Sequence, residues 1–179
     1  MTLTVSFVIM LVTIVIDQVT KMFLMSENLR FAYIPGFLYN EPMYNDGAAF
    51  SILSGKTIFF IIFTLAILLF IFYLLLTNKF SSSKFFKYSL SILAGGVIGN
   101  LIDRYYFKLV RDFWLVKPFK FICNFADVAI CVGTVLICVY IIFLHDFKNK
   151  RAKTRPTSKV KSETTSNDSA GNDTIKEEK

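Results

Sequence analysis

Four long apolar blocks alternate with polar stretches along the sequence. The central part of each block contains no Asp, Glu, Lys or Arg. A helix needs roughly 17–25 residues to cross a hydrocarbon core of about 30 Å, and each block reaches that length, or nearly so, once its flanks are added. The predicted transmembrane helices run over about 2–24, 58–77, 86–102 and 127–145. We therefore expect an all-α membrane protein, built as a bundle of four helices.

The composition supports this interpretation. Of 179 residues, 54% are hydrophobic and 18% are charged, whereas an average soluble domain is about 45–50% apolar and about 25% charged. This excess argues against a soluble globular enzyme and against a disordered chain. The first block lacks a basic segment before it and a small-residue cleavage site after it, so we interpret it as an uncleaved span rather than a signal peptide.

The net charge of +7 predicts an orientation in the membrane. Twelve Lys and Arg residues lie in the loop 78–87 and in the tail after 145, against seven in the two long loops 25–57 and 103–127. Cytoplasmic loops carry the excess of basic residues, so both termini are expected in the cytoplasm and both long loops outside. The basic residues therefore do not indicate a nucleic-acid partner.

The C-terminal tail, 146–179, is rich in Lys, Ser, Thr and Asp and has almost no apolar residues. Such a segment cannot bury a core, so we predict a disordered cytoplasmic extension. The odd number of cysteines, three, does not indicate a disulfide framework. The single histidine, His145, lies at the opposite end of the fourth span from the polar motifs, which argues against a histidine-based nucleophile or metal site.

Ionisable and amide residues gather where the first and third spans end and the fourth begins. These three points share one side of the membrane, so their side chains are predicted to converge. Simpler interpretations remain open: Asp17 and Lys21 could form an interfacial pair at i,i+4 spacing with the lysine reaching water, and Asp103 and Arg104 a surface pair. The converging residues are Asp17, Lys21, Asn100, Asp103, Arg104, Asp112, Asn124 and Asp127.

Glycines and turn residues predict close backbone approaches around these side chains. Gly95, Gly96 and Gly99 in the third span would let a neighbouring helix pack closely. Residues 45–50 have the composition of a tight turn with little side-chain bulk, and 31–39 is predicted as a strand, a turn and a second strand lying on the membrane.

Paired carboxylates are the chemistry that this residue set offers. Two aspartates held in a low-dielectric site share a proton, so one can activate water while the other donates to a carbonyl. That arrangement hydrolyses amide bonds. From residue types alone, an aspartate dyad is only one interpretation of several carboxylates.

Five motifs in this order resemble those of the bacterial lipoprotein signal peptidases (signal peptidase II), over about residues 5–145. They are DQVTK at 17–21, NDGAAF at 45–50, GGVIGNLIDR at 95–104, VRDF at 110–113 and NFAD at 124–127. The resemblance implies an aspartic endopeptidase, without metal or cofactor, at the outer face of the bacterial inner membrane. It would act on diacylglyceryl-modified prolipoproteins and cut before the lipidated cysteine.

The resemblance also implies residue roles. The catalytic pair would be Asp112 and Asp127, and a small extracytoplasmic β-cradle would come from the loop 25–57. Two features depart from the family pattern: Arg111, where an apolar residue is usual, and extra Lys and Pro in 114–123. The residues implied to line or support the substrate pocket are Asp17, Lys21, Asn45, Gly47, Asn100, Asp103, Arg104 and Asn124.

The sequence also allows two other functional classes. A small four-span transporter or proton-relay protein could use the same intramembrane charges, although transporters place such groups near the midplane and show internal repeats. An adaptor subunit would give Asp112 and Asp127 no special role. We expect a monomer whose partners are prolipoproteins and membrane lipids.

Overall fold

The computed structural model describes residues 1–26, 28–46 and 56–145, with side chains to 143. Four helices in this part are long and apolar enough to cross a membrane, which confirms the predicted class. Their bounds are α1 (Thr2–Leu24), α2 (Thr57–Thr77), α3 (Lys84–Phe107) and α4 (Phe125–Val139), the last continued by a π-helical segment, Tyr140–His145. The third helix passes beyond the end of its apolar block, and the charged Asp103 in this extension is buried.

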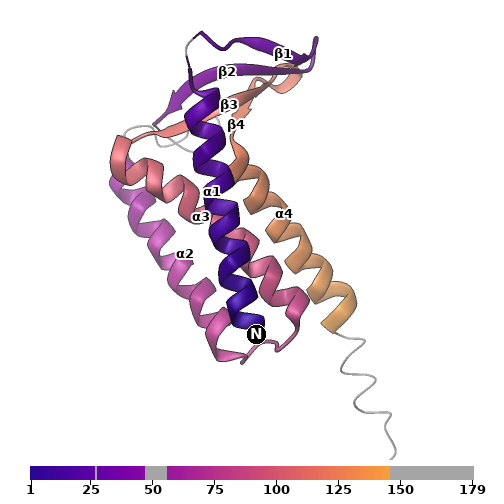
Figure 1. The fold of residues 1–179 in the computed structure, drawn as a ribbon. Coiled ribbons are helices and arrows are strands. Elements are labelled where there is room, and N and C mark those ends of the chain that lie inside the picture. Colours follow the sequence, from indigo (N-terminus) through magenta and orange to yellow (C-terminus); the bar gives the residue numbers. More distant parts are fainter. Residues whose placement is uncertain (27, 47–55, 146–179) are drawn as a thin grey trace, which may run out of the picture.

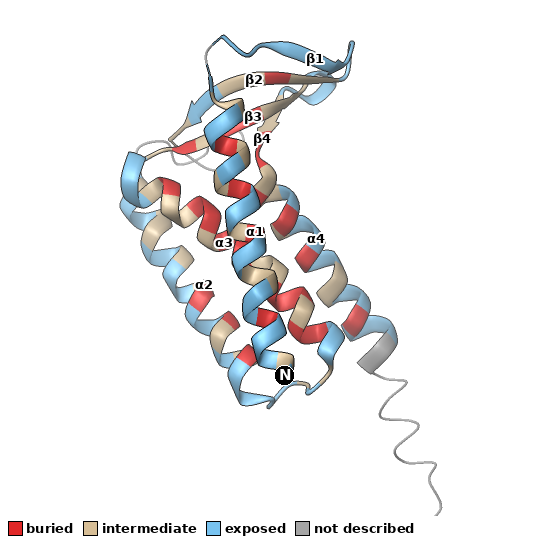
Figure 2. Cartoon of the chain, viewed as in Figure 1, coloured by how far each residue is buried: buried red, intermediate tan, exposed pale blue. Residues whose placement is uncertain are grey.

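The central helix of the bundle is α3, which packs against each of the other three helices. Figure 2 shows this in the burial colours, with α3 the most buried helix and long exposed faces on α1, α2 and α4. Those exposed faces carry large apolar side chains such as Leu11, Ile62, Leu69 and Val135. In a membrane, lipid tails would cover these side chains.

Two glycines in α3 set how closely the helices approach. A Cβ atom at Gly96 would lie 2.5 Å from the backbone oxygen of Ala126 in α4, and a Cβ atom at Gly99 would lie 2.5 Å from Oδ2 of Asp17 in α1. Both distances are far below van der Waals contact. These glycines are therefore packing residues, as the sequence predicted, and they bring α1 and α4 against the polar end of α3.

A four-stranded antiparallel sheet, in the order β1-β2-β3-β4, covers one end of the bundle (Figure 1). The expected strand-turn-strand is present, with Gly36 at φ +81° in its turn. The loop 25–57, from which the sheet was expected, supplies β1 and β2, whereas β3 and β4 come from loop 103–127, and β3 pairs with β2. The strands are β1 (Phe31–Ile34), β2 (Leu38–Asn45), β3 (Val110–Val116) and β4 (Phe121–Cys123).

The hydrophobic core lies away from this sheet, between α2, α3 and α4. Leu75, Phe86 and Tyr140 are almost completely buried there, and the Tyr140 and Ser81 hydroxyls form a hydrogen bond of 2.5 Å. The two ends of the bundle therefore differ in chemistry, with apolar packing at one end and buried charge at the other.

Candidate active site

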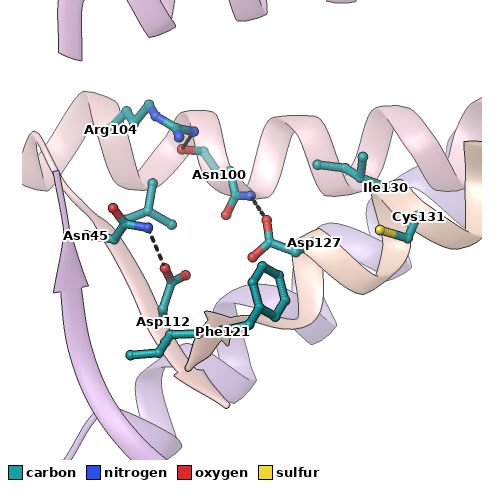
Figure 3. Close-up of a pocket in the computed structure, with 10 residues that line it drawn as sticks. Asn45, Asn100, Arg104, Asp112, Phe121, Asp127, Ile130 and Cys131 are labelled. Carbon is teal, nitrogen blue, oxygen red and sulfur yellow. Dashed lines mark hydrogen bonds between the residues drawn. The ribbon is translucent and has the colours of Figure 1, made fainter. Parts of the chain in front are cut away.

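A cleft of about 190 Å³ lies between the sheet and the ends of α3 and α4. Figure 3 shows Asp112 and Asp127 entering this space from different elements, with Asn45 and Asn100 beside them. The polar end of the bundle is therefore hollow and lined by two carboxyl groups. The lining residues are Asn45, Asn100, Arg104, Val110, Asp112, Phe121, Ile122, Asp127, Ile130 and Cys131.

Asp112 is carried by β3, opposite Met43 of β2. Its side chain is buried, and it accepts hydrogen bonds from Nδ2 of Asn124 at 2.6 Å and from Nδ2 of Asn45 at 3.0 Å. Burial, and after it the neighbouring Asp127 carboxylate, raise the pKa of Asp112 to about 7, although the hydrogen bonds from Asn45 and Asn124 oppose the change. At neutral pH this carboxyl group is therefore poised between its acid and base forms.

Asp127 is held in the first turn of α4 by a capping box. Its backbone N–H donates to Oδ1 of Asn124 at 3.0 Å, and the Asn124 backbone N–H donates back to its Oδ2 at 3.1 Å. The other carboxylate oxygen, Oδ1, accepts from Nδ2 of Asn100 at 2.8 Å. The Asn-x-x-Asp spacing thus fixes the carboxyl group at a helix N-terminus, where backbone N–H groups favour negative charge.

Two asparagines connect the carboxyl groups. Nδ2 of Asn124 donates both to Asp112 and to Oδ1 of Asn100, the latter at 3.0 Å. Because Asn100 in turn donates to Asp127, the amides form a continuous hydrogen-bonded path between the two aspartates. The path fixes the orientation of both carboxyl groups before any substrate is bound.

Behind this path lies a fully buried lysine. Nζ of Lys21 contacts Oδ2 of Asp17 at 2.9 Å, Oδ2 of Asp103 at 3.1 Å and Oδ1 of Asn100 at 3.0 Å. These acceptors match the three N–H donors of an ammonium group. The i,i+4 pair is therefore real, but the interpretation that its lysine reaches water is wrong, because α3 encloses it.

Asp103 and Arg104 diverge from one another at the end of α3. Asp103 is fully buried and forms ion pairs with Lys21 and Arg111. The interpretation that Asp103 and Arg104 form a surface ion pair is therefore wrong. Arg104 instead lines the cleft, and its guanidinium lies 5.2 Å from the centroid of the Phe60 ring. One helix end thus supplies both a structural carboxylate and a cation facing the cleft.

Two residues in this network have no predicted role in the sequence analysis. These residues are Gln18 and Arg111. Nε2 of Gln18 donates to Oδ2 of Asp17 at 3.0 Å and to the Gly99 carbonyl at 3.1 Å. Nη2 of Arg111 donates to Oε1 of Gln18 at 2.8 Å. Apart from Asp17, which is adjacent to Gln18, their hydrogen-bond partners lie eight or more residues away in the sequence, so local spacing gave no signal. Gly47, expected in the pocket, lies outside the described residues.

Cys123, at the end of β4, does not offer an alternative nucleophile. Cys123 is buried, and burial raises the pKa of its thiol to about 12, so the thiolate is scarcely populated at neutral pH. Within the described residues, no three His, Cys, Asp or Glu side chains cluster as metal ligands. Asp112 and Asp127 are the two carboxyl groups that line the cleft.

Comparison with known proteins decides the family. The family model described as signal peptidase (SPase) II matches residues 9–143. The chain belongs to the signal peptidase II family. A lipoprotein signal peptidase from Listeria welshimeri is 40% identical over 155 residues, covering 82% of this chain and 98% of the relative. One from Lactobacillus johnsonii is 35% identical over 144 residues, covering 78% and 92%.

Solved structures agree with this family assignment. A bacterial membrane enzyme determined by the in meso method at 2.3 Å resolution matches with a TM-score of 0.68 and 33% identity, over 88% of this chain and 95% of that one. A second such structure, at 1.9 Å resolution, matches with a TM-score of 0.66 and 33% identity, over 78% and 94%. This signal peptidase II family member is thus a multi-pass membrane peptidase that removes signal peptides from prolipoproteins, rather than a transporter or an adaptor.

Proposed function

We propose that Asp112 and Asp127 are the catalytic dyad of this peptidase. The observation that carries the proposal is their arrangement: they come from β3 and α4, they line one cleft, and an amide path through Asn100 and Asn124 orients both. A pKa of about 7 lets Asp112 keep a proton at neutral pH. The carboxyl group at the N-terminus of α4 then serves as the base.

The proposed reaction needs a single proton shared between the two groups. The Asp127 carboxylate takes a proton from a water molecule, whose oxygen attacks the scissile carbonyl carbon. Protonated Asp112 donates to the carbonyl oxygen, which gives a neutral tetrahedral intermediate. Protonated Asp127 then gives its proton to the amide nitrogen while the Asp112 carboxylate takes a proton from a hydroxyl of the intermediate, so that the C–N bond breaks and the dyad returns to its starting protonation state. Each positioned acid or base contributes about 10²- to 10⁴-fold to the rate.

The substrate is proposed to be a prolipoprotein that already carries a diacylglyceryl group on cysteine, with cleavage just before that residue. Apolar side chains of Phe121, Ile122 and Ile130 share the cleft with the carboxyl groups, which suits a substrate bearing acyl chains. Asn45, Arg104 and the two path asparagines are the polar groups positioned to bind the substrate backbone. Gly47 remains a prediction.

Asp17, Lys21 and Asp103 are proposed to support the site rather than to touch substrate. All three are fully buried behind Asn100, and Lys21 donates directly to it. We further propose that the enzyme is a monomer with both termini cytoplasmic, so that the cleft lies at the outer face. The basic excess in 78–87 and 146–179 supports that orientation.

A cleavage assay with matched substrates tests the proposed substrate class. The purified enzyme in detergent is incubated with a prolipoprotein peptide bearing S-diacylglyceryl cysteine and with the same peptide bearing free cysteine. Mass spectrometry locates the cut. We expect one product, cut before the cysteine, from the lipidated peptide alone. Equal turnover of the unmodified peptide, or a cut elsewhere, would contradict the proposed specificity.

A further inference from the structure

Arg111 lies beside the proposed catalytic residue Asp112 but belongs to a different interaction network. Successive side chains of a strand point to opposite faces, so Asp112 faces the cleft while Arg111 faces α1 and α3. Its side chain is 13% exposed. The guanidinium lies over the Phe107 ring, with its central carbon 4.6 Å from the ring centroid. This arginine is therefore an internal residue, packed between the strand and the helices.

Its contacts with Asp103 fix the backbone as well as the side chain. Nη2 and Nε of Arg111 donate to Oδ1 of Asp103 at 2.7 and 3.2 Å, and the Arg111 backbone N–H donates to Oδ2 at 3.0 Å. Nη2 also reaches Gln18 at 2.8 Å. One residue thus ties β3 to α3 and to α1, immediately before the peptide bond that leads into Asp112.

Arg111 also completes the charge of the buried cluster. Asp17 and Asp103 carry two negative charges against the single positive charge of Lys21, and all three side chains are fully buried. Arg111 supplies the second positive charge. A buried charge left without its partner is strongly destabilising. Nζ of Lys21 contacts Asn100 as well as the two carboxylates. The charge balance of the cluster therefore also affects the amide path that holds Asp127.

From this geometry we infer that Arg111 is a positioning residue for the peptidase reaction: by clamping β3 to Asp103 and Gln18, it sets where Asp112 stands relative to Asp127. The inference rests on the proposed dyad. It predicts an effect on turnover rather than on substrate affinity, because Arg111 faces away from the cleft. Misplacing a catalytic group by about 1 Å lowers the rate by about 100-fold.

Two variants separate positioning from simple structural support. Arg111→Met keeps the length and apolar stem but removes the guanidinium. Arg111→Lys keeps the charge but cannot reproduce the forked contact with Asp103 and Gln18. Arg30→Met is the matched control, because Arg30 is an exposed arginine whose recorded ion pair, with Glu41 at 3.3 Å, lies at the surface.

Cleavage of the lipidated peptide is measured as kcat and KM per mole of folded enzyme, with melting temperature measured in parallel. We expect kcat of Arg111→Met to fall about 10- to 100-fold, with KM changed less than about threefold. Arg111→Lys should regain most of the melting temperature but only part of kcat. Arg30→Met should match the parent in all three quantities.

A parental kcat in the folded fraction of both Arg111 variants would overturn the inference. So would an Arg111→Lys variant that regains the parental kcat together with the parental melting temperature. If Arg111→Met does not fold, Arg111→Lys alone decides between these outcomes. Asp112→Asn is assayed beside them. An active Asp112→Asn would reject the proposed dyad, whereas an inactive Asp112→Asn with a fully active Arg111→Met would reject only the role of Arg111.

Discussion

The stability of the Asp112→Asn variant relative to the parental protein should increase as the pH rises. The pKa of Asp112 is about 7 in the folded protein, against an ordinary value of 3.8. The folded state therefore keeps a proton that the unfolded chain releases between these pH values, and the parental protein loses stability as pH rises from about 4 to about 7. The asparagine variant does not titrate there, so it escapes this loss.

The size of the effect follows from the same two pKa values. A gap of about three pH units, at about 1.4 kcal/mol per unit, corresponds to about 4 kcal/mol, of which about 3 kcal/mol develops above pH 5. The variant also loses a hydrogen bond, because its NH2 group cannot accept from Asn45 or Asn124, and this costs about 1–3 kcal/mol. The change with pH in the stability difference between Asp112→Asn and the parent is therefore more diagnostic than the size of that difference at any one pH.

Thermal unfolding in detergent at pH 5, 6, 7 and 8 measures this trend. Trp114 is the only tryptophan and lies two residues beyond Asp112 on β3, so its fluorescence reports on this part of the site. The melting temperature of Asp112→Asn relative to the parent should rise by about 6–12 °C between pH 5 and pH 8. Glu41→Gln, at a partly exposed carboxylate on β2, is measured beside it as the control. A constant difference for Asp112→Asn across this range would refute the argument that Asp112 is buried beside a second carboxylate.

Three further predictions concern the membrane orientation, the tail and the helix packing. On a cysteine-free background, Ser26→Cys should react with a membrane-impermeant thiol reagent in intact cells and Ser82→Cys only after lysis; the reverse pattern would overturn the proposed orientation. Deleting 153–179 should leave turnover of the lipidated peptide nearly unchanged, because the family match ends at 143; a large loss in a truncated protein that still inserts would show a role for the tail. Gly96→Ala should lower the free energy of unfolding by about 1–3 kcal/mol, because its Cβ would lie 2.5 Å from the Ala126 carbonyl oxygen; an unchanged melting temperature would show that α4 gives way.

The four spans and the end of the bundle that holds the site were predictable from the sequence. Uninterrupted apolar blocks identify membrane helices, and four spans necessarily bring the ends of the first and third helices beside the start of the fourth. Asn124 and Asp127 also carry a local signal, since their spacing is that of a capping box.

The sheet and the buried charges depended on contacts that no local pattern specifies. Met43 and Asp112 pair across two loops that lie far apart in the chain, and their register depends on the whole sheet. Lys21 has the same i,i+4 spacing to Asp17 whether it reaches water or is buried; Asn100 and Asp103 on α3 decide the outcome. The contacts of Arg111 could not be predicted from local spacing either, because this strand residue binds Gln18 in α1 and Asp103 in α3.

The most direct test of the proposed dyad is the turnover of Asp112→Asn and Asp127→Asn on the lipidated peptide at pH 7, per mole of folded enzyme. Asparagine keeps the shape of the side chain but cannot exchange a proton with water or substrate. The kcat of each variant should therefore fall by about 100- to 10,000-fold. Asp103→Asn is the contrast, because Asp103 binds Lys21 and Arg111 rather than lining the cleft; its kcat should fall only in part. Near-parental turnover of folded Asp112→Asn or Asp127→Asn would contradict the aspartyl dyad proposed for this cleft.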